Sequence, residues 1–375
     1  MTKKMMVVFG TRPEAIKLAP VITALRARPD KFETVICSTG QHREMLVQAL
    51  DTFGLRPEID LDIMRPDQSL PDLTASLMTK ISEAIAVVRP DRVIVQGDTT
   101  TAFVAALAAY YAQVPVAHVE AGLRTHDRNN PFPEEINRRL ISAIADIHFA
   151  PTPGAAAALS SENVLPASVF VTGNTSVDAL LTLNKRLDTP IGMALVSTPV
   201  RALGEAAQSL ILVTCHRRES FGEDMAAICR ALRRVAIAHP HHRIVFPMHL
   251  NPNVRAHAIP LLGGIANISL LEPISYPEII YLLSRAVLAL SDSGGLQEEA
   301  PSLGVPVLVL RRKTERPEGI AAGVAQLVGA DEELIVRQAD ELLAQSGVRS
   351  KLGVANPYGD GRAAEKIADI LARAP

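Results

Sequence analysis

The sequence has no surplus of charge of either sign, few cysteines and no long apolar run. Its formal net charge is −2, whereas a protein that binds the phosphate backbone of a nucleic acid normally carries a clear basic surplus. The three cysteines, Cys37, Cys215 and Cys229, lack the spacing of metal ligands and are typical of buried thiols in a reducing compartment. These absences argue against nucleic acid as the main partner and against a metal site.

No segment has the length of a membrane span or the pattern of a cleaved leader. The apolar run at the start, residues 5–9, stops at Gly10, which is too short for the apolar region of a signal peptide. Nowhere does the chain approach the roughly 18 uninterrupted apolar residues that a membrane helix needs. We therefore expect a cytoplasmic protein with no membrane partner.

The length of 375 residues predicts two domains, because one hydrophobic core seldom supports a chain of this size. Short Val/Ile-rich runs alternate with longer segments of helical period, which is typical of a parallel α/β sheet. In the first half, this pattern predicts strands at 5–9, 33–37, 92–96, 116–120 and 147–150, and helices at 14–28 and 100–112. In the second half, it predicts strands at 210–214, 244–247, 268–270, 288–291 and 307–310, and helices at 224–238, 276–284 and 295–303.

The two series of elements are separated near residues 172–200. Residues 169–174 are predicted to be a strand that runs into a loop, with a helix from Ser176. The stretch 189–199 contains Pro, Gly and Ser without a clear period, which predicts a loop. We therefore expect two doubly wound, Rossmann-like domains, with ligands at the carboxyl ends of their strands.

Arg12 and Lys17 follow the first predicted strand. A helix that begins just after Gly10, with these two cations in its first turns, suits an anion. A plain strand-to-helix turn explains the segment equally well. The segment lacks the GxGxxG pattern, so no dinucleotide cofactor is expected.

Three acids of the first half stand where general acid or base chemistry could use them. Asp98 follows a strand, although it could merely cap the next helix. Glu120 ends a buried strand, where a carboxylate is costly unless it is functional or paired, for example with Arg124. Glu134 opens a helix, where the helix dipole alone favours an acid.

The second half offers groups that suit a phosphate. His216 stands beside Arg217 and Arg218 just after a strand, which indicates an anion site. The sequence Ser293-Gly294-Gly295 at a helix start exposes backbone amides to a phosphate, although an ordinary glycine turn looks the same. Glu299, one turn into that helix, could accept hydrogen bonds from ribose hydroxyls, and Arg316 could close over the same ligand.

Taken in order, these segments resemble the non-hydrolysing UDP-N-acetylglucosamine 2-epimerases of bacteria over almost the whole chain. The matching stretches are residues 9–14, 39–43, 96–99, 118–124, 130–135, 216–219, 249–252, 292–295, 314–317 and 356–361. The resemblance implies an α/β fold of GT-B architecture, with two Rossmann-like doubly wound domains facing a cleft and a last helix that crosses back to the first domain. The implied domains are residues 1–173 with 358–375, and residues 174–357.

The resemblance also implies a reaction, which is the reversible conversion of UDP-GlcNAc to UDP-ManNAc for bacterial surface polysaccharide precursors. Family active-site positions fall on Arg12, Lys17, Asp98, Glu120, Glu134 and His216. Positions that bind the UDP-sugar substrate fall on Ile274, Ile279, Ser293, Gly294, Gly295, Glu299 and Arg316. Ile274 stands where a relative has Gln, so only its backbone can meet the uracil. A homodimer without a cofactor or a metal is expected.

Many bacterial members are activated by UDP-GlcNAc at a second site, and Gln41, His42 and His249 match positions that contact this effector. Glu44 stands where some members have Gln, and Asp67 where some have Arg. Because a carboxylate is unfavourable near a diphosphate, most of all where it replaces a base, these two residues argue against effector activation.

Chemistry favours an elimination route for such an epimerase. The C2 proton is not next to a carbonyl, and the sequence offers no nicotinamide motif, so departure of UDP from C1 is the alternative to oxidation. We expect Asp98, Glu120 and Glu134 to share proton transfer at C2, with His216 and Arg12 stabilising the leaving diphosphate. A glycosyltransferase, a hydrolysing epimerase, an enzyme for UDP-2,3-diacetamido uronic acids and a non-catalytic nucleotide-sugar sensor are the alternatives.

Overall fold

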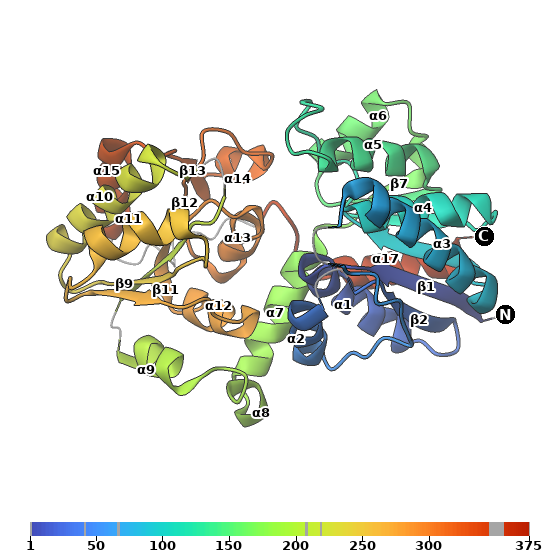
Figure 1. Ribbon diagram of the computed structural model, residues 1–375, viewed down its shortest axis with the longest axis horizontal. Coiled ribbons are helices and arrows are strands. Elements are labelled where there is room, and N and C mark those ends of the chain that lie inside the picture. Colours follow the sequence, from blue (N-terminus) through green and yellow to red (C-terminus); the bar gives the residue numbers. More distant parts are fainter. Residues whose placement is uncertain are drawn as a thin grey trace. The chain divides into compact units, whose positions relative to one another are not determined.

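The computed structural model describes residues 2–40, 43–65, 68–206, 209–217, 220–344 and 356–374. The chain forms two compact units (Figure 1), of which the first comprises Met1–Ala179 with Tyr358–Pro375 and the second Leu180–Pro357. Within the described ranges, no helix is both long enough and apolar enough to span a membrane.

The described residues of the first unit form a seven-stranded parallel sheet in the order β3-β2-β1-β4-β5-β6-β7. Its strands are β1 (Lys3–Phe9), β2 (Phe32–Ser38), β3 (Ile59–Asp60), β4 (Arg92–Gln96), β5 (Val116–Val119), β6 (Ile147–Ala150) and β7 (Val169–Val171). The helices are α1 (Arg12–Arg26), α2 (Arg43–Phe53), α3 (Leu70–Val88), α4 (Thr100–Tyr111), α5 (Glu134–Ile144), α6 (Pro153–Ser161), α7 (Thr175–Leu187), which crosses the unit boundary, and α17 (Ala363–Arg373).

The last helix, α17, belongs to the first unit although it comes at the end of the chain. It packs against α1, and Ile367 and Leu371 are fully buried there. Its first turn is held by Asp178 of α7, whose carboxylate accepts the backbone N–H groups of Ala363 (3.2 Å) and Ala364 (2.8 Å). A carboxylate at a helix N-terminus satisfies free amides and complements the helix dipole.

The described residues of the second unit form a six-stranded parallel sheet in the order β10-β9-β8-β11-β12-β13. Its strands are β8 (Leu210–Thr214), β9 (Arg243–Pro247), β10 (Ile268–Leu271), β11 (Ala286–Ser291), β12 (Val307–Val309) and β13 (Ala325–Leu327). The helices are α8 (Pro190–Met193), α9 (Thr198–Ala206), α10 (Glu223–Ala238), α11 (Pro252–Leu262), α12 (Tyr276–Leu283), α13 (Gly294–Glu299), α14 (Pro317–Ala321) and α15 (Glu332–Leu343).

Alternate residues of β8 pack into different clusters, so both faces of this sheet are buried. Leu210 and Leu212 join a cluster that contains residues of α12 and β12. Ile211 and Val213 join a second cluster, built mainly with α10, α11 and α15. Burial on both faces explains why the strand is a continuous apolar run, and it confirms the predicted class of two doubly wound α/β domains.

In each sheet the strand order reverses once, between β1 and β4 in the first unit and between β8 and β11 in the second. Ligands of open α/β sheets bind beyond the carboxyl ends of the strands at this switch point. The loops after these four strands carry Arg12, Asp98, His216 and Ser293. The topology therefore selects the same loops that the sequence singled out.

The prediction of a loop over 189–199 was wrong. Thr189 caps a single helical turn, α8, by accepting the N–H of Gly192 (3.1 Å), and Thr198 begins α9. A turn this short has no period for a sequence pattern to show. The predicted helix 295–303 also divides, since α13 ends at Glu299 and a 3-10 turn covers Ala300–Leu303. Pro301 has no N–H for an α-helical hydrogen bond.

Candidate active site

Glu14 ties together the loops that follow β1 and β4. Its carboxylate accepts the backbone N–H groups of Gly10 (3.1 Å) and Thr11 (2.8 Å), and the hydroxyl of Thr99 (2.7 Å). Burial raises the pKa of this carboxyl group, against the opposing effect of the hydrogen bonds. Glu14 therefore has a structural role, while Arg12 at the helix start is exposed.

Glu120 is a buried carboxylate surrounded by donors from three other segments. The ammonium group of Lys17 and the amides of Gln96 and Asn174 all donate to it, the last at 2.9 Å. Arg124, the alternative partner considered from the sequence, pairs instead with Glu162 (2.7 Å). The structure thus brings the predicted residues Lys17 and Glu120 together.

The backbone of Glu120 adds a second sign of specialisation. The strand β5 ends one residue earlier than predicted, at Val119, and Glu120 has a φ of 63°. A non-glycine residue in the left-handed region costs of order 1 kcal/mol and is typical of functional sites. This conformation turns the carboxylate toward Lys17 instead of continuing the strand.

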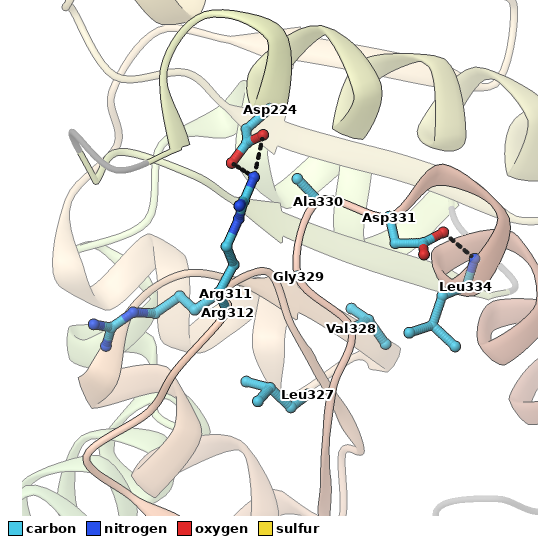
Figure 2. A pocket seen from close by; sticks show the side chains of 9 residues that line it. All are labelled: Asp224, Arg311, Arg312, Leu327, Val328, Gly329, Ala330, Asp331 and Leu334. Carbon is cyan, nitrogen blue, oxygen red and sulfur yellow. Dashed lines mark hydrogen bonds and ion pairs between the residues drawn. The ribbon is translucent and has the colours of Figure 1, made fainter.

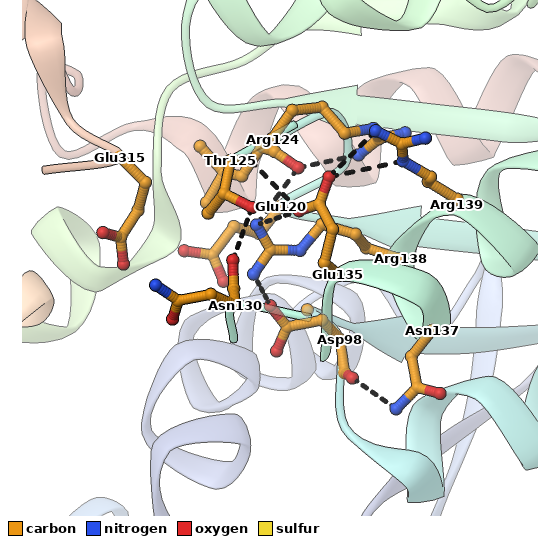
Figure 3. A network of polar contacts seen from close by, with 12 residues as sticks. Asp98, Glu120, Arg124, Thr125, Asn130, Glu135, Asn137, Arg138, Arg139 and Glu315 are labelled. Atoms are coloured by element: carbon orange, nitrogen blue, oxygen red, sulfur yellow. Dashed lines mark hydrogen bonds and ion pairs between the residues drawn. The ribbon is translucent and has the colours of Figure 1, made fainter. Parts of the chain in front are cut away.

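Asp98 does not cap α4, because Thr99 does so by accepting the N–H of Ala102 (3.0 Å). The Asp98 side chain instead pairs with the guanidinium group of Arg138, and its carbonyl accepts from the amide of Asn137 (2.9 Å). Figure 3 shows both residues of α5 reaching toward Asp98. Asp98 is therefore held by the helix that begins with Glu134, a third predicted acid.

The neighbouring acid, Glu135, is structural. Its side chain is fully buried, accepts the backbone N–H groups of Thr125 (3.1 Å) and His126 (3.3 Å), and pairs with Arg138 (3.4 Å) and Arg139 (3.2 Å). These contacts anchor the loop after β5 to α5 (Figure 3). Glu134, which precedes it, is only partly buried.

In the second unit, Asp292 organises the loop that carries His216. One carboxylate oxygen accepts the backbone N–H groups of His216 and Arg217, both at 2.8 Å, and the other lies 3.2 Å from Nδ1 of His216. Burial alone would raise the pKa of Asp292, but His216 and the backbone amides outweigh it and hold the pKa below its usual value. Asp292 is therefore an anion at neutral pH.

Arg316 lies directly over the glycine turn at the start of α13. A Cβ atom on Gly294 would stand 2.7 Å from the guanidinium carbon of Arg316. That guanidinium group is fixed by Glu298 (2.7 Å) and Glu315 (2.7 Å), so it could not move aside without breaking these pairs. A side chain at position 294 would therefore displace Arg316 from these pairs, and the structure places Gly294 and Arg316 in contact.

The other predicted substrate-binding residues of this unit occupy the same end of the sheet. The hydroxyl of Tyr276 donates to Glu299 (2.9 Å), which fixes the acid proposed to meet a ribose. Ile274 and Ile279 are partly buried and pack on the apolar cluster under α12. A Cβ atom on Gly295 would meet nothing closer than the Ser293 hydroxyl, at 3.8 Å, so the backbone there is open.

The residues matched to an effector site are described only in part. Gln41, His42 and Asp67 lie outside the described residues, and so does the side chain of Glu44. His249 is described, and its ring stacks on that of His216 with centroids 6.2 Å apart. Burial, followed by the neighbouring His216, lowers the pKa of His249.

A pocket of about 420 Å³ lies elsewhere in the second unit, beyond the ends of β12 and β13 (Figure 2). Arg312 pairs with Asp224 at its wall (3.0 Å), and Asp331 caps α15 by accepting the N–H of Leu334 (3.0 Å). The predicted substrate-binding residues are not among those that line it. Across the described ranges, no three His, Cys, Asp or Glu side chains are grouped to hold a metal ion.

The sequence missed the residues that hold the candidate groups in place. Gln96 and Asn174 meet Glu120, Arg138 meets Asp98, and Glu298 meets Arg316. Arg138 is the only one with a local signal, because it lies four residues after Glu134 on the same helix face. The other contacts join segments that are distant in sequence, and no spacing pattern reveals them.

Comparison with known proteins identifies the family. The family model described as UDP-N-acetylglucosamine 2-epimerase matches residues 23–372. The chain is 48% identical over 366 residues to a probable UDP-N-acetylglucosamine 2-epimerase of Ralstonia solanacearum, with 97% of each chain covered. It is 46% identical over 379 residues to UDP-N-acetylglucosamine 2-epimerase of Campylobacter jejuni, with 99% of this chain and 98% of the relative covered.

A solved structure agrees with these relatives. The crystal structure of the UDP-GlcNAc 2-epimerase of Neisseria meningitidis, bound to UDP-GlcNAc, matches with a TM-score of 0.89 and 43% sequence identity. The match covers 99% of this chain and 100% of the Neisseria chain. Both the sequence and the fold therefore match over nearly the full length. The chain belongs to the UDP-N-acetylglucosamine 2-epimerase family and is an epimerase.

Proposed function

We propose that this protein interconverts UDP-GlcNAc and UDP-ManNAc by eliminating UDP and adding it back. The observation that carries the proposal is the set of three acids, Asp98, Glu120 and Glu134, on elements that meet beyond β4 and β5. The relative from Neisseria meningitidis, bound to UDP-GlcNAc, supports the choice of substrate. The use of the product in bacterial surface polysaccharide synthesis is part of the same proposal.

Each unit, taken by itself, holds groups that suit part of this reaction. In the second unit, the turn 293–295 and Arg316 bind the diphosphate, and Glu299 binds the ribose. Ile274 and Ile279 flank the uracil. His216 in this unit suits the charge that develops on the leaving diphosphate, and Arg12 in the first unit is a cation that suits the same charge.

The chemistry at C2 is a proton transfer coupled to departure of UDP. One carboxylate takes the C2 proton, the electron pair of that bond forms the C1–C2 double bond, and the C1–O bond breaks with its electrons leaving on UDP. In the return step, a diphosphate oxygen attacks C1 while an acid protonates C2 from the opposite face. Two proton-transfer groups, one on each face, explain why the site holds several acids.

The first test is incubation of the purified protein with UDP-GlcNAc in D₂O, without metal or nicotinamide cofactor. We expect UDP-ManNAc with deuterium at C2, detected by NMR. Free ManNAc with UDP would instead identify a hydrolysing enzyme, and UDP release that depends on an added acceptor would identify a glycosyltransferase. Absence of any turnover would refute the proposal.

Amide variants then assign the acids. Asp98→Asn, Glu120→Gln and Glu134→Gln are each expected to lower turnover by about 10²- to 10⁴-fold, the usual contribution of positioned proton transfer. Deuterium exchange at C2, measured separately from each sugar isomer, identifies the acid that serves each face. Unchanged exchange in all three variants would remove these residues from the role.

We further propose a homodimer that is not activated by UDP-GlcNAc at a second site. The resemblance supports the dimer, and the acids Glu44 and Asp67 argue against binding of a second diphosphate. Light scattering coupled to size exclusion tests the dimer. Without activation, we expect the rate of the reverse reaction to depend hyperbolically on the concentration of UDP-ManNAc. Added UDP-GlcNAc should then change this rate only by simple competition.

A further inference from the structure

Asp292 is fully buried, and its two carboxylate oxygens meet different groups. Its Oδ2 atom accepts from the backbone amides of His216 and Arg217, from the hydroxyl of Ser220 (3.3 Å) and from the thiol of Cys215 (3.2 Å). Its Oδ1 atom is left to face Nδ1 of His216 at 3.2 Å. One oxygen thus shapes the loop, and the other meets the imidazole ring.

This division of contacts favours one of the two ring nitrogens of His216 as the protonated one. Since Asp292 is ionised, its Oδ1 atom can only accept, so the 3.2 Å contact favours a proton on Nδ1, although the two atoms lie at the distance of an ion pair without the alignment of a full hydrogen bond. The proton of the neutral ring then resides on Nδ1, and Nε2 is the nitrogen that gains and loses the second proton. The His216 side chain is 42% exposed, so a ligand can reach the ring.

The neighbours of the ring allow the same assignment. The His249 ring stacks on His216 and directs its own Nδ1 to the backbone N–H of Asn251 (3.1 Å), so it does not compete for Asp292. Burial, as the main cause, and then the neighbouring His216 lower the pKa of His249, which disfavours the charged form of this second ring. Asp292 is therefore the anion that faces the His216 ring among the described residues.

We propose that Asp292 is a positioning residue, which holds His216 with a proton on Nδ1, so that Nε2 takes up the second proton and the resulting imidazolium, paired with Asp292, donates it to the departing diphosphate. The proposal rests on the proposed function for the identity of the ligand at Nε2, but the tautomer itself does not. A buried carboxylate behind a working histidine fixes ring orientation and tautomer in other enzymes. Here the same carboxylate also builds the loop that presents the ring.

The test compares the wild-type protein with Asp292→Asn by ¹⁵N NMR of labelled histidine, with His216 assigned from its absence in His216→Gln. In the wild type, we expect a protonated Nδ1 and an unprotonated Nε2 in the neutral ring. Asparagine can still accept the loop amides through its oxygen, while its NH₂ group faces Nδ1. The variant should therefore show the opposite tautomer. It also lacks the anion that pairs with the His216 imidazolium, so we expect a kcat lower by about 10²- to 10⁴-fold, with little change in KM.

Ser220→Ala is the matched control, because it removes one donor to Oδ2 without touching the ring. It should retain the wild-type tautomer and most of the activity. A wild-type ring protonated on Nε2 would overturn the proposal even if Asp292→Asn does not fold. The protein could instead show the expected tautomer but no epimerase activity. That result would support the tautomer assignment and refute the proposed function.

Discussion

Two candidate acids of the first unit, Glu120 and Asp98, are held by different kinds of donor. Glu120 is met by an ammonium group and two side-chain amides, whereas Asp98 is met by the guanidinium group of Arg138. Arg138 is itself buried, and it also contacts Glu135 and the carbonyl of Leu123 (3.3 Å). A residue fixed at three points presents Asp98 in one orientation, which proton transfer requires.

Replacing Arg138 with Met should therefore damage catalysis more than binding. The carboxylate of Asp98 would lose its cation, and breaking a buried ion pair costs about 3–5 kcal/mol at most; the 30% exposure of the Asp98 side chain reduces that cost. We expect kcat to fall by about 10- to 100-fold, a loss of roughly 1.4–2.7 kcal/mol of transition-state stabilisation, with KM nearly unchanged. Steady-state kinetics measures both constants.

Arg139→Met is the matched control for this change. Arg139 also pairs with Glu135, but its side chain is 39% exposed and its guanidinium group is directed to Glu135 and Glu162. The control should keep most of the activity and lose little stability. Equal losses of kcat in the two variants would show that Arg138 acts only by anchoring Glu135, not by holding Asp98.

At the scale of elements, most of the fold could be predicted because buried parallel strands are apolar runs. The strands β4, β6 and β8 begin and end at the predicted residues. The strand β3, of two residues, and the helix α8, of one turn, were not predicted because neither is long enough to show a periodic pattern of apolar residues. The loops of the site were found for a topological reason, since they follow strands, but the partners inside them depend on tertiary contacts such as Asn174 to Glu120.

Strand β5 carries a buried histidine that supports the loop of Asp98. The Nε2 atom of His118 donates to the carbonyl of Gly97 (2.7 Å), and burial, as the main cause, lowers the pKa of His118 to about 3. His148, the paired residue on β6, has its pKa lowered to about 4, also mainly by burial. Both rings are therefore neutral in the folded protein at physiological pH.

These histidines should make the first unit less stable in acid. Below pH 6.5 the unfolded chain binds a proton at His118, whereas the folded protein does not until about pH 3, so stability falls as pH decreases through that window and levels off below it. Between pH 7 and 5 the loss from one such group is about 2 kcal/mol. Urea unfolding at a series of pH values measures this loss of unfolding free energy. Unfolding of the first unit is detected by hydrogen exchange of peptides from β5, with every sample labelled at the same fixed pH.

The variant His118→Asn should unfold with a shallower dependence on pH, because His148 is then the only one of this pair that contributes. His241→Asn, at an exposed position, is the control and should keep the wild-type dependence. A pH dependence that is the same in all three proteins would show that His118 takes up a proton without unfolding, and that its ring is not excluded from water.

At the scale of the whole molecule, the first unit is completed only by the last residues of the chain. Residues 358–375 return to it, Asn174 donates its backbone N–H to the carbonyl of Tyr358 (2.6 Å), and α17 packs on α1. Asn174 also donates its side-chain amide to Glu120. The returning segment and the candidate catalytic acid are therefore connected through one residue.

Because the two units have separate cores, a core mutation at the end of the chain should destabilise the unit at its beginning. Ile367→Ala in α17 removes a fully buried side chain of the first unit, at a cost of about 2–5 kcal/mol. Ile335→Ala in α15 makes the same change in the core of the second unit. We expect hydrogen exchange to accelerate in β1 and β4 with the first variant, and in β8 and β11 with the second. If Ile367→Ala affected both sheets equally, the two units would unfold as one cooperative body, and residues 358–375 would stabilise the whole chain instead of the first unit alone.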